Sequence, residues 1–246
     1  IHAFRSLLPS PFPLRDPIAP KTELPHVFIR ARIEIDGKSQ VGISADHLPP
    51  KWFTKDPSRD PREEIADMLA VIRQATGCAA GMTGRTVFAL WRHIYAAQAA
   101  WALVRQIPLL LAHFGTSLVE RAVIDAWCRA RGEPFHRLLA AGDLGMELGE
   151  LSPDLAGSSP SDWLPAAPLT SVWIRHTVGL ADPITTDDIA PGERFTDGLP
   201  QALDECIRRY GLCHLQLKLS GQRDADFERL EAIAAVCTGT TAKAAP

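Results

Sequence analysis

The stretch that most constrains the fold of this chain is 213–221, where polar and apolar residues alternate and end at a Ser-Gly turn. Alternate residues of a strand point to opposite faces, so the leucines share one face and the polar residues share the other. The two sets are Leu215, Leu217 and Leu219, and His214, Gln216 and Lys218. Such a strand suits a parallel barrel, with leucines under the outer helices and polar groups inside. Lys218 comes last on the polar face, at the strand end where (β/α)8 barrels carry their chemistry, and could abstract a proton there.

The charge balance and the apolar runs limit the partners that we expect. The formal net charge is -3 and no basic run occurs, so no nucleic-acid partner is expected. The longest apolar run, 107–112, is too short to span a bilayer. No signal-peptide pattern is visible either, so no membrane partner is expected.

The five cysteines are odd in number and show no C-x-x-C spacing. A zinc site and a disulfide framework are therefore disfavoured, and we predict no metal-ligating residues. Reduced thiols predict a cytoplasmic protein.

The first part of the chain predicts a hairpin. The proline-rich residues 1–25 predict a loop or an extended arm. Alternation over 27–35, the Asp36-Gly37 dipeptide and a return stretch at 40–45 predict an antiparallel β-hairpin. A second loop, rich in proline, follows at 46–57.

Three helices are predicted after this loop. Asp60-Pro61 opens the first, because proline suits the first helical position. The second covers about 86–105. The third begins at Ser117, which is spaced to form a capping box with Glu120, and stops at Gly132.

The last part of the chain alternates between strands and helices. Its Gly, Ser and Pro content predicts a linker over 141–170. We predict strands at 172–178 and 213–219, and helices at 224–236 and at 199–209, the latter capped by Asp197. This order indicates β–α–β units and a parallel sheet.

Two motifs in this order resemble a known family. Residues 117–139, within T-S-L-V-E-R-A-V-I-D-A-W-C-R-A-R-G-E-P-F-H-R-L-L, look like the signature helix of a capping domain in the enolase superfamily. The branch that they resemble contains mandelate racemase and muconate lactonizing enzyme. The stretch H-L-Q-L-K-L-S-G at 214–221 is similar to the end of that family's second barrel strand, which usually reads Lys-x-Lys. The resemblance covers nearly all of residues 1–237.

The resemblance implies an α+β capping domain followed by the start of an α/β barrel of the TIM type, here incomplete. Residues 1–147 would form the capping domain, 148–170 a linker, 171–237 the first two β–α units of the barrel, and 238–246 a disordered tail. Eight strands close such a barrel and take ~250 residues, whereas the sequence in hand reaches only the second strand and its helix.

The family implies a lyase or isomerase, such as a dehydratase or racemase, that removes the proton alpha to a carboxylate of a small acid or sugar acid. The residue that matches the family's base is Lys218, and Gln216 stands where the first lysine of Lys-x-Lys usually stands. Gln216 supplies a hydrogen bond but no charge, so the activation of Lys218 is left open. Without the resemblance, Lys218 is a solvated lysine at a strand end and Gln216 a hydrogen-bonded interior residue.

The family also implies a Mg²⁺ ion that stabilises the enediolate, held by acidic residues at the ends of the third, fourth and fifth barrel strands. These strands are not recognised in this sequence. We therefore expect the metal ligands to be absent from this chain and the chain alone not to be catalytically competent. Open barrel edges predict self-association.

Four further residues are candidates for substrate binding. Arg15, in the first loop, could grip a carboxylate or be merely solvated. Trp52 and Phe53, in the second loop, could form a lid over an active site or plug a domain interface. His176, in the first barrel strand, could belong to the rim of the active site.

Three classes of function are open. The first is an amino-terminal part of an enolase-superfamily enzyme. The second is a non-catalytic remnant, or an interaction module whose apolar edge binds another chain. The third is an α+β binding domain with an unrelated β–α tail. The nucleotide sequence that follows codon 246 separates the first two.

Overall fold

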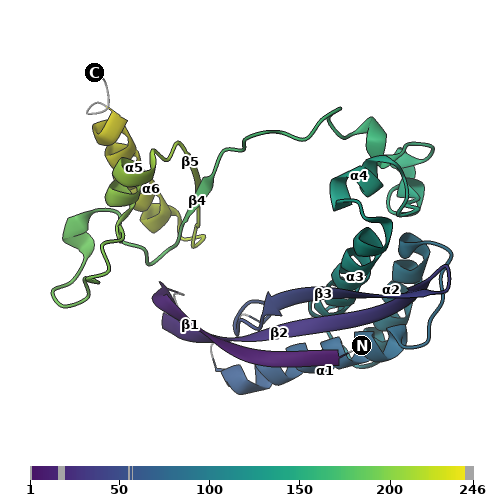
Figure 1. Cartoon of the computed structure of the whole chain (residues 1–246). Helices are drawn as coiled ribbons and strands as arrows, with labels where there is room; N and C mark the ends of the chain where they lie inside the picture. The colour runs from purple at the N-terminus through teal and green to yellow at the C-terminus, as the bar shows by residue number, and fades with distance from the viewer. Residues whose placement is uncertain (1, 16–19, 55, 57, 242–246) are drawn as a thin grey trace. The chain divides into compact units, whose positions relative to one another are not determined.

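The computed structural model describes residues 2–15, 20–54, 56 and 58–241, with only the backbone course given for 2–15, 20–24, 240 and 241. Contacts divide the chain into two compact units, whose main parts are Glu23–Leu169 and Thr170–Pro246 (Figure 1). The division falls at the carboxyl end of the stretch 148–170 that was expected to be a linker. Each unit is described by itself.

A three-stranded sheet opens the first unit. Its strands are β1 (His2–Arg15), β2 (Pro20–Ile35) and β3 (Lys38–His47), in the order β1-β2-β3. Strands β2 and β3 are antiparallel, and Ile35 pairs with Lys38 across the turn. Both turn residues have positive φ, 51° at Asp36 and 73° at Gly37, as a type I′ turn requires. The predicted hairpin is confirmed.

The proline-rich segment is extended rather than a loop. Strand β1 lies at an edge of the sheet, the place where prolines are tolerated because they cannot donate to a ladder. Pro9, Pro11 and Pro13 alternate, so the N–H groups that they lack belong to one edge of the strand.

Helices α1 (Pro61–Ala79) and α2 (Val87–Val104) begin where their capping residues predict. Asp60 Oδ1 accepts a hydrogen bond from the N–H of Arg62 at 2.8 Å. Thr86 Oγ1 accepts one from the N–H of Ala89 at 3.0 Å. Each side chain satisfies a donor that the first helical turn leaves unpaired.

Helix α3 (Leu109–Arg131) begins at Leu109, so the predicted start at Ser117 is wrong. Ser117 Oγ donates to the carbonyl of Phe114 at 2.9 Å inside the helix and caps nothing. The residues before Ser117 stay helical because Leu111, Ala112 and Gly115 are buried in the core. Packing therefore outweighs the local capping signal.

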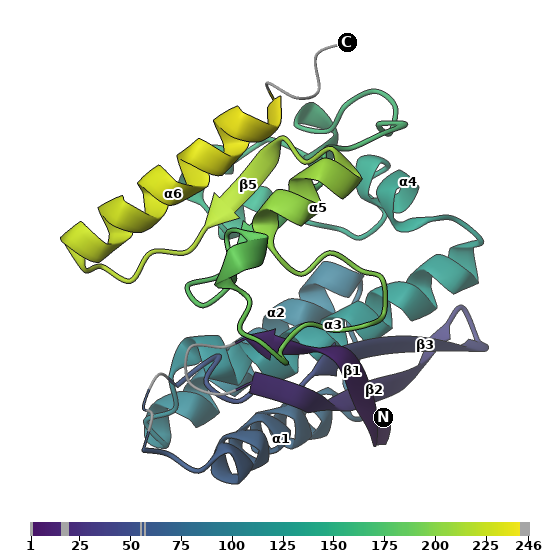
Figure 2. The ribbon, with the colours of Figure 1, turned by 90° about the vertical axis from the view of Figure 1, so that its left-hand side faces the viewer.

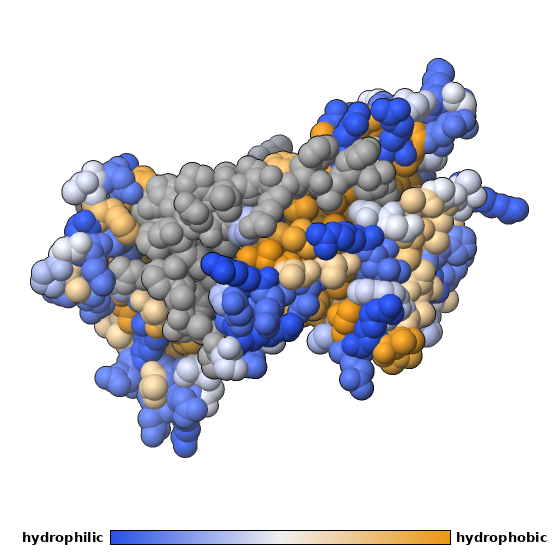
Figure 3. All heavy atoms as spheres, turned by 90° about the horizontal axis from the view of Figure 1, so that it is seen from below, coloured by the Kyte–Doolittle hydropathy of each residue, from blue (hydrophilic) through white to orange (hydrophobic). Residues whose placement is uncertain are grey.

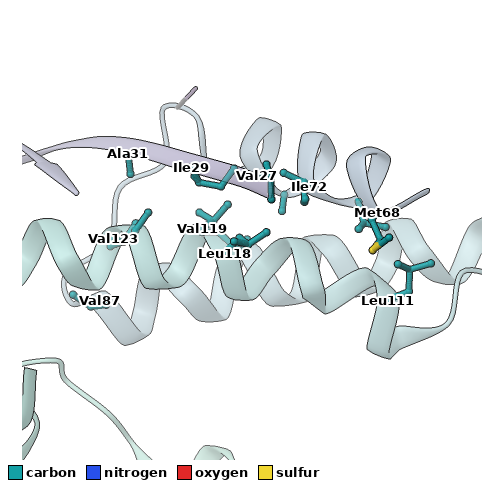
Figure 4. Packing of buried hydrophobic residues seen from close by; sticks show 14 of the residues in the cluster. Val27, Ile29, Ala31, Met68, Ile72, Val87, Leu111, Leu118, Val119 and Val123 are labelled. Atoms are coloured by element: carbon teal, nitrogen blue, oxygen red, sulfur yellow. The ribbon is translucent and has the colours of Figure 1, made fainter. Parts of the chain in front are cut away.

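The core of the first unit lies between the sheet and helices α1 and α3 (Figure 4). Alternate residues of β2 point toward the helices: Val27, Ile29 and Ala31. Across from them lie buried side chains of α1 and α3, including Met68, Ile72, Leu118, Val119 and Val123. Gly42 of β3 lets the sheet approach α3 closely, since a Cβ at Gly42 would clash with the main chain at Ala122 and Ala126.

The expected linker packs with the first unit. After α4 (Phe135–Ala140), the chain forms three single-turn 3₁₀ helices: η1 (Leu148–Glu150), η2 (Pro153–Leu155) and η3 (Pro160–Asp162). Glu150 of η1 pairs with Arg92 of α2, with Oε2 and Nε 2.7 Å apart. This stretch therefore has turns and contacts of its own.

The second unit is a β–α–β–α run, as the alternation of patterns predicts. Its elements are β4 (Arg175–Val178), η4 (Thr186–Asp188), α5 (Leu203–Tyr210), β5 (His214–Leu217) and α6 (Arg223–Thr241). Strands β4 and β5 are parallel. A small core joins β4, β5, α5 and α6, and both helices lie next to β5 (Figure 2). Its buried members are Val178, Ile184, Leu203, Ile207 and Ile233.

Several boundaries in this unit differ from prediction. Strand β4 begins at Arg175 rather than at residue 172, and β5 spans His214–Leu217 rather than 213–219. Helix α5 begins at Leu203 rather than Leu199, and Asp197 instead accepts from the N–H of Leu199 in the preceding loop. Helix α6 continues to Thr241, so the first residues of the expected disordered tail, 238–241, are helical. Thr238 Oγ1 bonds to the carbonyls of Ala234 and Ala235, which gives its hydroxyl a partner inside the helix.

Within the described ranges, no helix combines the length and the apolar character needed to cross a bilayer. The face shown in Figure 3 mixes hydrophilic and hydrophobic side chains.

Candidate functional site

The candidate site is the polar face of the β4–β5 pair. In the parallel register, Arg175 lies opposite His214 and Thr177 opposite Gln216. The other face carries Val178, Leu215 and Leu217, which pack in the small core with α5 and α6. The alternation read from the sequence of β5 is therefore the one that the structure shows, with leucines toward helices and polar groups away from them.

Lys218 directly follows β5, at the carboxyl-terminal ends of the two parallel strands. Its N–H donates to the carbonyl of Val178 at 3.0 Å, which continues the ladder by one bond. Its side chain is exposed. The amine thus leaves the strand at the carboxyl edge, which is where a proton-abstracting group of a parallel barrel is expected.

Gln216 lies one step deeper on the same face. Its Oε1 accepts a hydrogen bond from Thr177 Oγ1 at 3.4 Å, near the distance limit for such a bond. Below this pair, the rings of Trp173 and His214 are in contact, with centroids 5.4 Å apart. Gln216 therefore acts as a hydrogen-bonded neighbour of Lys218 and contributes no charge.

The charged side chains that these two strands place on the polar face are all cationic. Neither 172–178 nor 213–219 contains an aspartate or glutamate. Arg175 and Lys218 both extend from the polar side of the sheet, where Arg175 lies opposite His214 and Lys218 comes four residues after His214. Cationic groups without a neighbouring carboxylate in the same strands favour an anionic ligand such as a carboxylate.

Side chains of α6 fix the loops around Lys218. Arg229 Nη2 donates to the carbonyls of Gly179 and Asp182, at 2.5 and 2.9 Å, and so ties down the turn after β4. Asp226 accepts from the N–H groups of Ser220 and Gly221 at 2.8 and 2.9 Å. These backbone hydrogen bonds, that of Ser220 foremost, hold the pKa of Asp226 below its usual range. Both turns that flank Lys218 are therefore anchored.

His176 does not lie on the polar face. It pairs with Leu215 in the register and shares its face with Val178, the side that packs against helices. The expectation that His176 joins Lys218 at an active-site rim is therefore not supported by its position. The sequence carried the signal, since His176 is two residues from both Ile174 and Val178 and so falls on the apolar side of the alternation.

The other predicted residues belong to different parts of the chain. Phe53 packs against the core of the first unit, and its ring lies 5.2 Å from that of Phe114, centroid to centroid. Trp52, next to it, is 63% exposed. Arg15 ends β1, and its side chain lies outside the described part of the structure. Phe53 therefore has a packing role, and Trp52 keeps the side-chain exposure that ligand contact needs.

Sequence reasoning missed Arg175, Thr177 and Arg229. The first two follow from the alternation in β4 once its apolar face is known. Arg229 is 50 residues from Gly179 in the chain, and no local sequence pattern predicts the hydrogen bond between them.

The described residues do not fit a magnesium site. They contain no group of three or more His, Cys, Asp or Glu side chains placed to hold a metal ion. Searches against protein families, curated proteins and solved structures found no match to this chain.

Proposed function

We propose that this chain carries the capping domain and the first two β–α units of an enolase-superfamily enzyme, in which Lys218 is the base. The observation that carries the proposal is the place of Lys218: it follows a parallel strand, at the carboxyl edge, on the polar face of the pair. The substrate class is a small carboxylate or sugar acid, because the face is cationic and its strands contain no carboxylate.

In this reaction the amine of Lys218 takes the proton from the carbon next to the carboxylate, and the electron pair of the broken C–H bond passes into the resulting enediolate. Gln216 and the anchored turns on either side of Lys218 hold its main chain in place, and Arg175 adds positive charge to the same face. The family uses magnesium, and the described residues contain no group of three or more His, Cys, Asp or Glu side chains placed to hold it.

The nucleotide sequence that follows codon 246 is the first test. The proposal expects further strand and helix patterns in one reading frame, with Asp or Glu at the ends of the strands. A stop codon with no such pattern in any frame contradicts it.

The second test measures the base directly in a protein that contains those further strands. Lys218→Ala is expected to slow deuterium exchange at the α-carbon of a 2-hydroxy carboxylate by ~10²–10⁴. Lys38→Ala, at the exposed tip of the β2–β3 hairpin, is the control and should leave exchange unchanged. Equal exchange in the Lys218→Ala variant and the native protein removes Lys218 as the base.

A second candidate function is binding to another copy of this chain. Val172, Trp173 and Ile174, just before β4, are 75%, 78% and 74% exposed. The β4–β5 sheet has two strands in the described structure, so its outer edges are available for pairing. Sedimentation should then show concentration-dependent association, reduced by the double change Trp173→Ser and Ile174→Ser. A monomer at all concentrations excludes this candidate.

A further inference from the structure

Lys51 is a buried lysine in the turn between β3 and α1. It is 5% exposed, and its backbone adopts a left-handed conformation, with φ at 65°. Lysine is almost never fully buried unless it is paired, and positive φ is uncommon for a residue with a Cβ. Both features indicate that the surrounding contacts determine this conformation.

Those contacts converge on Glu64, in the first turn of α1, which is also 5% exposed. Lys51 Nζ lies 2.6 Å from Glu64 Oε1, and the N–H of Lys51 donates to Glu64 Oε2 at 2.7 Å. One carboxylate therefore holds both the side chain and the main chain of Lys51. Nζ also donates to the carbonyls of Asp56 and Arg59, at 2.8 and 2.5 Å, so its three protons all have acceptors.

The residues that follow Lys51 are held unequally. Trp52 is 63% exposed, while Phe53 packs on Phe114 in the core. Trp52 thus stands between a buried ion pair on one side and a packed ring on the other. Moving its backbone would break the buried hydrogen bond from the N–H of Lys51 to Glu64 or pull Phe53 out of the core, and both changes are unfavourable.

We propose that the Lys51–Glu64 pair is a clamp that holds the backbone of residues 51–53 rigid, so that this segment does not open and close as a lid. Lys51 and Glu64 are positioning residues, because one carboxylate fixes both the side chain and the main chain of Lys51. The clamp does not depend on the proposed function and is tested without any activity.

The test is hydrogen exchange of the native chain and two variants, Lys51→Met and Glu64→Gln. In the native chain, the N–H of Lys51 should exchange slowly, as a buried hydrogen-bonded amide does. In each variant, exchange at Lys51–Phe53 should be at least tenfold faster, while buried amides at Leu118–Ala122 keep their native rates. Lys38→Met, at the exposed hairpin tip, is the control and should leave all of these rates unchanged.

Fluorine NMR of 5-fluorotryptophan adds a readout at Trp52 itself, with its signal assigned by Trp52→Phe. We expect a single signal in the native chain and a shifted or narrower one in both clamp variants. Fast exchange at Lys51 in the native chain, or an unchanged Trp52 signal in the variants, overturns the clamp. The native measurement decides the point even where a variant does not fold. Neither readout involves Lys218, so a failure of the clamp and a failure of the proposed base are told apart.

Discussion

Gly115 of α3 lies directly against the main chain of Val71 in α1. A Cβ at Gly115 would overlap the carbonyl group of Val71 and the amide nitrogen of Ile72. The two helices pack at this closeness because Gly115 has no side chain. Backbone atoms cannot move aside as the end of a flexible side chain can, so the contact tolerates no added atom.

Gly115→Ala should therefore destabilise the first unit, by about 1–3 kcal/mol. Gly77→Ala is the matched control, since Gly77 lies in α1, is exposed and has open space around the added methyl group. That change should stabilise the unit by about 0.5–1 kcal/mol, because alanine loses less backbone freedom on folding. Urea denaturation followed by circular dichroism measures both. Equal shifts in the two variants would contradict the close packing.

Gln98 of α2 donates through Nε2 to the carbonyls of Val71 and Ala112, at 2.9 Å each, and is fully buried. Gln98→Glu would place a carboxylate against two carbonyl oxygens with no donor to offer them. The free energy of unfolding at pH 7 is expected to fall by about 3 kcal/mol or more.

Burial raises the pKa of a carboxyl at this position, so part of that loss should be recovered at pH 5, where the group takes up a proton. Gln106→Glu, at an exposed position of the same unit, serves as the control and should change stability little at either pH. Denaturation of both variants at the two pH values measures this. A loss that is the same at both pH values would show that the charge is not its cause.

Burial lowers the pKa of His113 below its usual value of 6.5. Its ring stacks on Tyr95 with centroids 3.7 Å apart, and Nδ1 lies 3.2 Å from Thr116 Oγ1. As the pH is lowered, the unfolded chain binds a proton at this histidine at a higher pH than the folded chain does. Stability is therefore complete above pH 6.5 and decreases as the pH falls from 6.5 toward the lower pKa of the folded state.

His113→Gln should make the pH dependence between 7.5 and 5 shallower, by less than about 1 kcal/mol because the ring is only partly buried. His93→Gln, on the exposed side of α2, should leave the slope unchanged. Free energies of unfolding at several pH values measure this effect. If the free energy of unfolding of His113→Gln depends on pH as steeply as that of the native chain, His113 is not the source of this dependence. The lowered pKa of His26, caused by burial and by His47, acts in the same direction and stays in both variants.

Glu205 caps helix α5 from inside its first turn. One carboxylate oxygen accepts from the N–H groups of Gln201 and Ala202, at 3.0 and 3.2 Å, and the other pairs with Arg194. The ion pair with Arg194 and these hydrogen bonds lower the pKa of Glu205 to about 2. Because its folded pKa is depressed, this contribution to stability is present above pH 4.5 and is lost as the pH falls from 4.5 to about 2.

Glu205→Gln should weaken the start of α5 by about 1 kcal/mol at pH 7, a modest value because its partner Arg194 is 47% exposed and solvent screens the ion pair. Amide exchange at Gln201 and Ala202 should accelerate accordingly. Glu228→Gln, at an exposed position of α6, is the control. Unchanged exchange at both amides would show that Glu205 does not cap the helix.

Local signals predicted the elements that depend on a few neighbouring residues. Asp36-Gly37 indicated the hairpin turn, and Asp60-Pro61 indicated the start of the first helix. These signals work because the turn conformation and the capping bond involve residues at most three positions apart. The face alternation of β5, with Lys218 at its end, was read correctly for the same reason.

Signals that compete with packing were misread. The Ser117–Glu120 spacing resembles a capping box, yet both residues lie inside α3 because the segment before them is buried. Asp197 was assigned the cap of α5, but Glu205 holds it from within the helix. In α3, the free energy of burying a helix face exceeds the small contribution of one cap, whereas at α5 one capping side chain takes the place of another.

The sequence by itself determined which residues alternate, which turns close and that Lys218 ends a parallel strand, because these features depend on neighbouring positions. Only the tertiary structure decided that Lys51 and Glu64 form a buried pair, that Gly115 meets Val71 and that Arg229 reaches the turn after β4. These contacts join residues 13, 44 and 50 positions apart. Their partners are chosen by the packing of whole helices against the sheets, which no local pattern of residues contains.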